Sequence, residues 1–222
     1  MTRPVMKPID LIIFDLDGTL VNTLEDIAAS VNFALQKLGR PLIPVDSVRQ
    51  YVGDGIEMLM TRALNGRDEF LPDAVGIYKV HHSRNLLVRS RLYPMVTDVL
   101  EHFRAVPMAV ISNKTSEFVQ PLLDGLKISG YFRLVLGADS GLPLKPAPDA
   151  VQKLMAEFKA PQDRTVIVGD GTTDVRAGKA AGVITCSVTY GFRSEEELRK
   201  AGPDYVIHDL SELKELFIPA KR

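Results

Sequence analysis

The strongest constraint on the fold of this chain is the segment 9–19, a mostly apolar run that ends in two acidic residues. The run is rich in isoleucine, which is typical of a buried β-strand. Asp15 and Asp17 stand two positions apart, so in an extended segment their side chains share one face. Two carboxylates held close together repel each other unless a cation or a proton offsets their charge. The segment therefore predicts a strand followed either by a simple polar turn or by a charged site.

Composition excludes several classes of protein. The chain has 222 residues, of which 45% are hydrophobic and 25% are charged, with a formal net charge of −1. These values are typical of a globular protein, and the near-zero charge predicts neither nucleic acid nor membranes as partners. The single cysteine, Cys186, cannot form an internal disulfide, and residues 1–8 show no secretory pattern. No apolar run approaches the roughly 20 residues that span a bilayer. We therefore expect a cytoplasmic protein, whose oligomeric state the sequence does not predict.

Hydrophobic periodicity divides the chain into two kinds of segment. Apolar residues recur every three or four positions over 24–38, and further helices are predicted over 45–52, from residue 56, and over 73–87. Residues 21–92 therefore resemble an all-helical insertion between residues 1–20 and 93–222. In the second part, predicted strands at 106–111, 134–136, 165–168, 183–188 and 205–207 alternate with predicted helices. This alternation predicts an α/β fold with a doubly wound parallel sheet and an inserted helical domain.

Several strand ends and one loop carry polar side chains: Asp15 and Asp17, Ser112 and Asn113, Lys145, and Asp170 with Asp174. Because the carboxyl ends of parallel strands meet at one edge of the sheet, we expect these groups to lie together. A carboxylate can attack phosphorus and form an aspartyl-phosphate, which splits one difficult step into two easier ones. The carboxylates and the phosphate are all negative, and hard oxygen ligands favour Mg²⁺ as the balancing cation. The pattern predicts Mg²⁺-dependent phosphoryl transfer.

The segment 15–19, Asp-Leu-Asp-Gly-Thr, resembles the first motif of the haloacid dehalogenase-like (HAD) superfamily. The other motifs follow in order, so the resemblance covers essentially the whole chain and implies a Rossmann-like core. It implies that Asp15 is the nucleophile, and that Asp17 first protonates the leaving oxygen and later activates water. For the substrate, it implies that Thr19 shapes the first binding loop, that Ser112 and Asn113 bind the phosphoryl group, and that Lys145 neutralises it. For the metal, it implies that Asp15, Asp170 and the Asp17 carbonyl bind Mg²⁺ and that Asp174 supports the metal site.

The helical insertion resembles a cap that closes over such a site and excludes water. Its segments 31–35, 51–55 and 62–64 resemble phosphoglycolate phosphatases in particular. Two positions depart from this pattern, since Asn22 stands where many relatives carry Asp and Met95 where relatives often carry Gly. A small phosphate bearing a carboxylate requires a cation, and Arg62 is the nearest arginine in the matching segment. The alternative for Arg62 is a solvated surface position.

Other functions are possible on the same scaffold. A sugar-phosphate mutase, an inorganic pyrophosphatase and a phosphonate hydrolase remain alternatives, as does a non-enzymatic phosphate-sensing module. A dehalogenase is disfavoured because Asp17 is retained, and a binding module would not need that residue either. A phosphonate hydrolase needs a Schiff-base lysine in the insertion, where Lys37 and Lys79 are the only lysines. His81 and His82 are adjacent in a predicted helix, show no metal-ligand spacing, and are expected on a solvated face.

Overall fold

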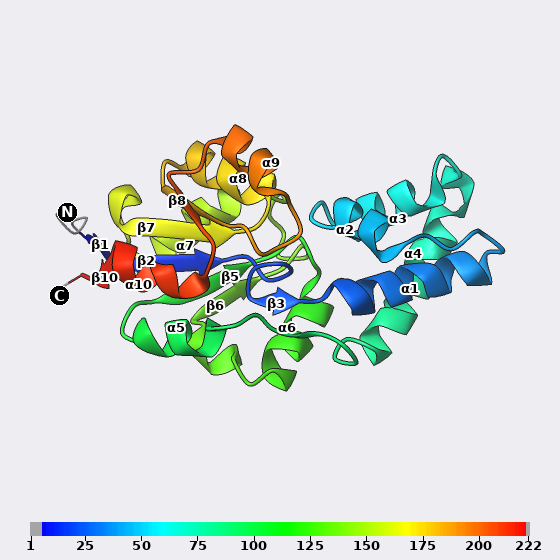
Figure 1. Ribbon diagram of the computed structural model, residues 1–222, viewed down its shortest axis with the longest axis horizontal. Helices are drawn as coiled ribbons and strands as arrows, with labels where there is room; N and C mark the ends of the chain where they lie inside the picture. The colour runs from blue at the N-terminus through cyan, green and yellow to red at the C-terminus, as the bar shows by residue number, and fades with distance from the viewer. Residues whose placement is uncertain (1–5, 221–222) are drawn as a thin grey trace.

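The computed structural model describes residues 6–220, and its centre is a parallel sheet covered by helices on both faces (Figure 1). Residues 1–5 and 221–222 lie outside the described residues. The expectation that residues 1–8 carry no secretory signal therefore falls partly outside them. The sheet has six strands, in the order β6 (Leu134–Leu136), β5 (Met108–Ile111), β2 (Leu11–Phe14), β7 (Thr165–Gly169), β8 (Ile184–Val188) and β9 (Tyr205–Ile207). The predicted doubly wound α/β fold is confirmed.

Strand β2 occupies the middle of the sheet. Ile13 pairs with Ala109 of β5 on one side and with Ile167 of β7 on the other. All four residues of β2 are buried, as expected for a parallel strand covered on both faces. The chain first extends the sheet to one side of β2 and then to the other, which leaves a crevice at the carboxyl end of β2. Asp15 and Asp17 follow β2 directly at this crevice.

Alternating side chains of β2 belong to the two faces of the sheet. Leu11 and Ile13 lie in the core beneath α7 (Asp149–Phe158) and α8 (Thr172–Ala181). Ile12 and Phe14 lie in the other core, beneath α5 (Val96–His102) and α6 (Ser116–Gly125). This alternation is the period of two that a strand imposes on its side chains. Because both faces are covered by helices, the sequence of β2 is apolar throughout.

The helices of residues 24–84 lie together beyond the carboxyl ends of the strands, at the end of the molecule opposite the termini (Figure 1). They are α1 (Leu24–Lys37), α2 (Val45–Tyr51), α3 (Ile56–Leu64) and α4 (Leu71–Arg84). The chain enters this region through β3 (Val21–Asn22) and returns through β4 (Arg91–Leu92), and these two strands pair antiparallel. The two crossings therefore lie side by side. Within residues 6–220, no helix has the length and apolar character needed to cross a membrane.

Several elements differ from the prediction at their boundaries. Strand β5 begins at Met108, two residues later than predicted, and α4 begins at Leu71, two residues earlier. Helix α6 runs through Pro121, a residue type that commonly kinks a helix or delays its start. The helix nevertheless begins at Ser116. Pro121 has no amide hydrogen to donate to the carbonyl of Glu117, but Glu117 lies in an exposed turn of the helix. The remaining strands and α-helices of the described residues are β1 (Lys7–Ile9) paired with β10 (Phe217–Pro219), α9 (Glu195–Ala201) and α10 (Leu213–Leu216).

The predicted solvated position is wrong for His82, which is buried, whereas His81 is partly exposed. His82 is only 1% exposed, and the Nδ1 atoms of His81 and His82 lie 3.0 and 3.1 Å from the hydroxyl oxygen of Ser30. Ala74, Tyr78 and His82 are the buried residues of α4 and recur every fourth position. Burial lowers the pKa of His82 to about 2, so its ring is neutral. His82 is a core residue of the helical region.

Asp26 ties α1 to the segment that returns from the helical region to the sheet. Its buried carboxylate accepts hydrogen bonds from the amides of Arg89 (3.0 Å) and Ser90 (2.7 Å) and from the Ser90 hydroxyl (2.7 Å). Asp26→Ala leaves these donors without an acceptor, so we expect the free energy of unfolding in urea to fall by about 2–4 kcal/mol. Asp124→Ala, on the exposed surface of α6, is the control and should change it by less than about 0.5 kcal/mol. An equal, small effect of both substitutions would contradict the structural role of Asp26.

Candidate active site

A cavity of about 320 Å³ lies between the carboxyl ends of the strands and the α2–α3 part of the helical region. Seven of the nine predicted site residues line it: Asp15, Asp17, Arg62, Ser112, Asn113, Lys145 and Asp170. The other two, Thr19 and Asp174, are buried behind the wall and bind residues that line the cavity. The structure therefore brings together groups that are up to 159 positions apart (from Asp15 to Asp174) in the sequence.

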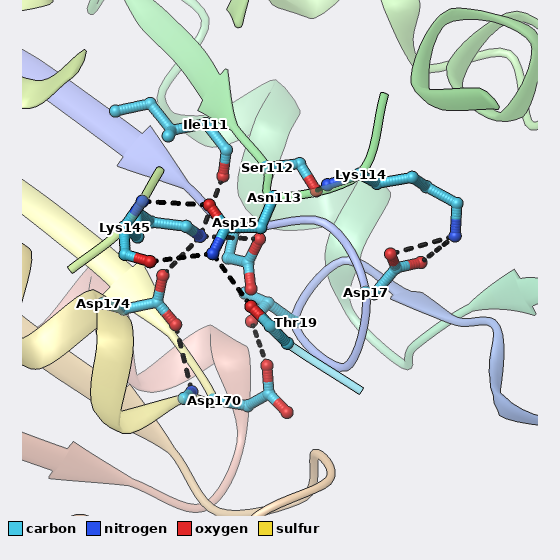
Figure 2. Close-up of polar contacts among 12 residues, drawn as sticks. Asp15, Asp17, Thr19, Ile111, Ser112, Asn113, Lys114, Lys145, Asp170 and Asp174 are labelled. Carbon is cyan, nitrogen blue, oxygen red and sulfur yellow. Dashed lines mark hydrogen bonds and ion pairs between the residues drawn. The ribbon is translucent and has the colours of Figure 1, made fainter. Parts of the chain in front are cut away.

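Lys145 joins two of the acidic residues. Its ammonium nitrogen lies 2.9 Å from Asp15 Oδ1, 2.6 Å from Asp174 Oδ1 and 3.0 Å from the carbonyl oxygen of Ile111 (Figure 2). Lys145 is 4% exposed, and its burial disfavours the charged form. The carboxylates of Asp15 and Asp174 outweigh this effect and raise the pKa of Lys145, so the side chain is a fixed cation beside Asp15.

Two hydrogen bonds hold the Asp170 carboxylate, and two glycines leave the space that it occupies. The hydroxyl of Thr19 donates to Oδ1 at 3.1 Å and the amide of Phe192 donates to Oδ2 at 2.7 Å. A Cβ atom at Gly18 or at Gly191 would lie 2.2 Å from an atom of the Asp170 side chain, so only glycine leaves room for this carboxylate. Gly18 also has a φ of +84°, which other residues resist. Burial raises the pKa of Asp170 to about 6, although the Phe192 amide acts in the opposite direction.

Asp15, Asp170 and Asp174 form a group of three carboxylates. Each offers an oxygen atom, and these oxygens all lie within 4.8 Å of one another. Burial raises the pKa of Asp15 well above its ordinary value, and the charges of Asp174 and Asp170 add to this against the effect of Lys145. One lysine cannot balance three carboxylates, so a small cation would stabilise the group. An all-oxygen donor set, with the space that Gly18 and Gly191 leave around Asp170, fits a hard divalent metal ion.

Asp17 lies apart from this group, in an ion pair with Lys114 (Figure 2). The Lys114 ammonium nitrogen is 3.0 Å from both carboxylate oxygens of Asp17, and the hydroxyl of Thr23 donates to Oδ1 at 2.6 Å. The exposed fractions of the Lys114 and Asp17 side chains are 8% and 11%. No role was predicted for Lys114 from the sequence. The available signal was its position directly after Ser112 and Asn113, at a strand end that already carried predicted site residues.

The side chain of Asn113 connects three parts of the structure. Its amide nitrogen donates to the carbonyls of Gly53 and Lys145, each at 2.9 Å, and its amide oxygen accepts from the Lys145 amide at 3.0 Å. Asn113 therefore fixes the loop that carries Lys145 and reaches the segment between α2 and α3. The hydroxyl oxygen of Ser112 accepts a hydrogen bond from the Lys114 amide at 3.2 Å, while the side chain lines the cavity.

Two arginines line the cavity and contact the α2–α3 part of the helical region. Arg62, from the last turn of α3, is 32% exposed and pairs with the Asp54 carboxylate at 2.5 Å. Asp54 therefore does not cap α3, whose N-cap is Gly55, because its carboxylate is occupied by Arg62. Arg193, which belongs to the strand side, donates to two carbonyls at the end of α2, including that of Val52 at 2.5 Å. These contacts hold the α2–α3 segment over the strand ends.

Comparisons with known proteins agree with this architecture. The family described as haloacid dehalogenase-like hydrolase matches residues 12–188. A phosphoglycolate phosphatase of Pseudomonas fluorescens (strain Pf0-1) is 37% identical over 213 residues, which cover 91% of this chain and 78% of that protein. One of Colwellia psychrerythraea (strain 34H) is 34% identical, with coverages of 92% and 95%. The crystal structure of a predicted phosphoglycolate phosphatase from Haemophilus somnus 129PT superposes with a TM-score of 0.90 at 31% identity, covering 95% of this chain and 99% of that one.

Fold, acidic strand ends and matched family together define a hydrolase with a Rossmann-like core. The chain belongs to the haloacid dehalogenase-like hydrolase family. The predicted resemblance to the phosphoglycolate phosphatases of this family is confirmed by its relatives. The same relatives confirm that the chain is an enzyme of the phosphoric monoester hydrolase class, which acts on a small phosphate ester.

Proposed function

We propose that this protein is a cytoplasmic, Mg²⁺-dependent phosphatase that hydrolyses 2-phosphoglycolate or a similar small phosphomonoester through an aspartyl-phosphate. The observation that carries the proposal is the position of Asp15, which pairs with Lys145 at 2.9 Å and belongs to a group of three carboxylates beside the cavity. A second carboxylate, Asp17, follows on the same loop and would transfer protons once its side chain turns toward the site. The phosphoglycolate phosphatases related to this chain support the choice of substrate.

Asp15, Asp170 and the backbone carbonyl of Asp17 would hold Mg²⁺, and Asp174 would support them from behind. Both Asp174 oxygens already accept hydrogen bonds, from Lys145 at 2.6 Å and from the Gly171 amide at 3.0 Å, which suits a supporting role. The metal would supply positive charge that offsets the repulsion between the carboxylates and the substrate phosphate. Thr19, by its hydrogen bond to Asp170, keeps that carboxylate in place.

The protein groups then divide the reaction between them. Asp15 attacks phosphorus, while the Ser112 hydroxyl and the Lys145 ammonium stabilise the phosphoryl oxygens. Asn113 fixes the loop that carries Lys145. Asp17 gives a proton to the leaving oxygen and later removes one from the water that hydrolyses the aspartyl-phosphate. Because the side chain of Asp17 is paired with Lys114, it has to turn toward the reacting phosphate before it acts.

We propose further that residues 21–92 form a cap over a core made of residues 1–20 and 93–222. The hydrogen bonds from Asn113 to Gly53 and from Arg193 to Val52 support closure of the cap over the cavity. A closed cap excludes water, which strengthens electrostatic interactions in the site and limits wasteful reactions. Arg62, which lines the cavity and is paired with Asp54, would face the bound substrate from the helical side.

The alternative functions lack a matching feature. A phosphonate hydrolase requires a lysine that reaches the cavity from the helical insertion, but Lys79 pairs with Glu117 at 3.3 Å, and Lys37 lies over the ring of Phe33 at 5.3 Å. Neither lysine lines the cavity of the described chain. A phosphate-sensing module would not need Asp17. A mutase or a pyrophosphatase remains possible on the same scaffold, and a panel of substrates distinguishes them.

The test is a panel of phosphate compounds assayed with Mg²⁺, with excess chelator, and with Ca²⁺. We expect release of phosphate from 2-phosphoglycolate in Mg²⁺, loss of activity with chelator, and recovery when Mg²⁺ is restored. Ca²⁺ should substitute poorly, because its larger and looser ligand shell displaces the phosphoryl group from Asp15. Full activity in excess chelator would remove Asp170 from its proposed role. Activity confined to pyrophosphate, to phosphonates or to isomerisation of a sugar phosphate would favour the corresponding alternative.

A further inference from the structure

The ion pair between Lys114 and Asp17 is incompatible with the proposed action of Asp17. In the structure the Asp17 carboxylate is held by the Lys114 ammonium and the Thr23 hydroxyl, to one side of the group around Asp15 (Figure 2). To reach an oxygen on a phosphate at Asp15, Asp17 has to leave Lys114. Catalysis therefore includes a step in which this ion pair breaks.

When the pair breaks, the Lys114 ammonium is left without an anionic partner. The Lys114 side chain is only 8% exposed, so water replaces a lost carboxylate incompletely. An ammonium with little access to water and no anionic partner is costly, and removing one member of such a pair is strongly unfavourable. Asp17 turns readily only if another anion takes its place at Lys114. In the proposed reaction the phosphate is held by Asp15, Lys145 and Ser112, so a second anionic group of the substrate is the candidate partner for Lys114.

The other cations that line the cavity in residues 6–220 keep at least one partner throughout the reaction, with one exception. Lys145 pairs with Asp15 and Asp174, Arg62 pairs with Asp54, and Arg193 binds the carbonyls at the end of α2. The exception is Arg176, an exposed side chain at the rim. Lys114 is thus the enclosed cation that loses its partner during the reaction.

We propose that Lys114 determines specificity for phosphomonoesters that carry a carboxylate close to the ester oxygen, by exchanging Asp17 for that carboxylate. In the free enzyme Lys114 holds Asp17. When the substrate is bound, its carboxylate pairs with Lys114, and Asp17 is released to act at the leaving oxygen. No covalent bond changes in this exchange and no proton is transferred. The inference rests on the proposed function, because it names the feature of the substrate that the same site selects.

The exchange couples recognition to catalysis. A substrate with a neutral group in place of the carboxylate leaves Asp17 paired with Lys114, so it reacts slowly even when it is bound. The carboxylate should therefore raise kcat as well as lower KM, because its contact with Lys114 accompanies the active arrangement of Asp17. A lysine with a purely structural role would affect both kinds of substrate equally.

The experiment compares 2-phosphoglycolate with 2-hydroxyethyl phosphate, in which a neutral alcohol replaces the carboxylate. Lys114→Met should lower kcat/KM for 2-phosphoglycolate by about ten- to a hundredfold. For 2-hydroxyethyl phosphate it should lower kcat/KM by less than about threefold or raise it, since Asp17 is no longer held. Lys114→Arg should recover part of the preference. Arg176→Met removes a positive charge from the same cavity and should affect both substrates alike. Urea unfolding of each variant confirms that it is folded.

The outcomes separate the two proposals. If the wild-type enzyme hydrolyses neither compound, the proposed function itself fails and the inference falls with it. If it hydrolyses both and Lys114→Met lowers both rates equally, the proposed function stands and the inference is overturned. If Lys114→Met does not fold, Lys114→Gln and Lys114→Arg give the same comparison, and an unchanged preference in both would overturn the inference.

Discussion

Asp15→Asn is expected to abolish turnover while the protein stays folded. The substitution keeps the shape of the side chain and removes the charge that attacks phosphorus, so we expect kcat to fall by about four orders of magnitude or more. It also removes one of three neighbouring carboxylates, whose mutual repulsion and burial raise the pKa of Asp15. The lost contact with Lys145 opposes this gain. The free energy of unfolding in urea should therefore hold or rise slightly, and it should be measured beside phosphate release.

Asp10→Asn is the matched control for this experiment. Asp10 precedes the same strand, and its carboxylate lies 3.5 Å from Arg164, away from the cavity. The same chemical change at this position should leave kcat and KM unchanged. Most of the activity remaining in Asp15→Asn would contradict an aspartyl-phosphate at this residue.

Asp17→Asn should separate the two halves of the reaction. The substitution keeps the shape of the side chain and the backbone carbonyl, and Asp15 remains as nucleophile. An aryl phosphate with an activated leaving group needs no proton, so it should still phosphorylate Asp15. Water would then lack its base, and hydrolysis of the intermediate should be slow. We expect a burst of aryl alcohol equal to the enzyme concentration, followed by a slow phase, with phosphate retained on the protein.

An alkyl phosphate provides the second half of the test. Its leaving oxygen requires a proton that the amide introduced by Asp17→Asn cannot supply, so neither burst nor trapped phosphate should occur with this variant. Asp10→Asn should turn over both substrates without accumulating phosphoprotein. Equal behaviour of Asp17→Asn toward both substrates, or turnover without a trapped intermediate, would show that Asp17 is a structural or metal-site residue.

Features that depend on local sequence patterns were predictable. The apolar strands, and the helix that begins near Asp149 after the Lys145 loop, follow from periodicity and from turn residues close to them in the chain. The meeting of Asp15, Ser112 and Asp170 follows from one rule, that parallel strands end at the same edge of the sheet. The proximity of these residues could be predicted without knowledge of side-chain positions.

Features that depend on contacts between distant side chains were not predictable. The Lys114–Asp17 pair joins residues 97 positions apart, and nothing in the sequence around either residue specifies the other. Ser30 and His82 meet across α1 and α4, so a histidine that looks solvated in a helical pattern is buried. Arg193 lies in a loop, and its partner carbonyls are main-chain atoms, which leave no mark in the sequence.

The central position of β2 has a consequence for how the enzyme is made. Both neighbours of this strand, β5 and β7, are encoded after the whole helical region, and Ile13 meets Ala109 and Ile167. As the chain leaves the ribosome, β2 therefore emerges without either partner and keeps two unpaired edges until its partner strands have been synthesised. Closing such long loops costs entropy before the pairing repays it, and an apolar, unpaired strand is prone to associate with other chains. The segment that ends in the proposed nucleophile therefore needs protection from association with other chains during synthesis.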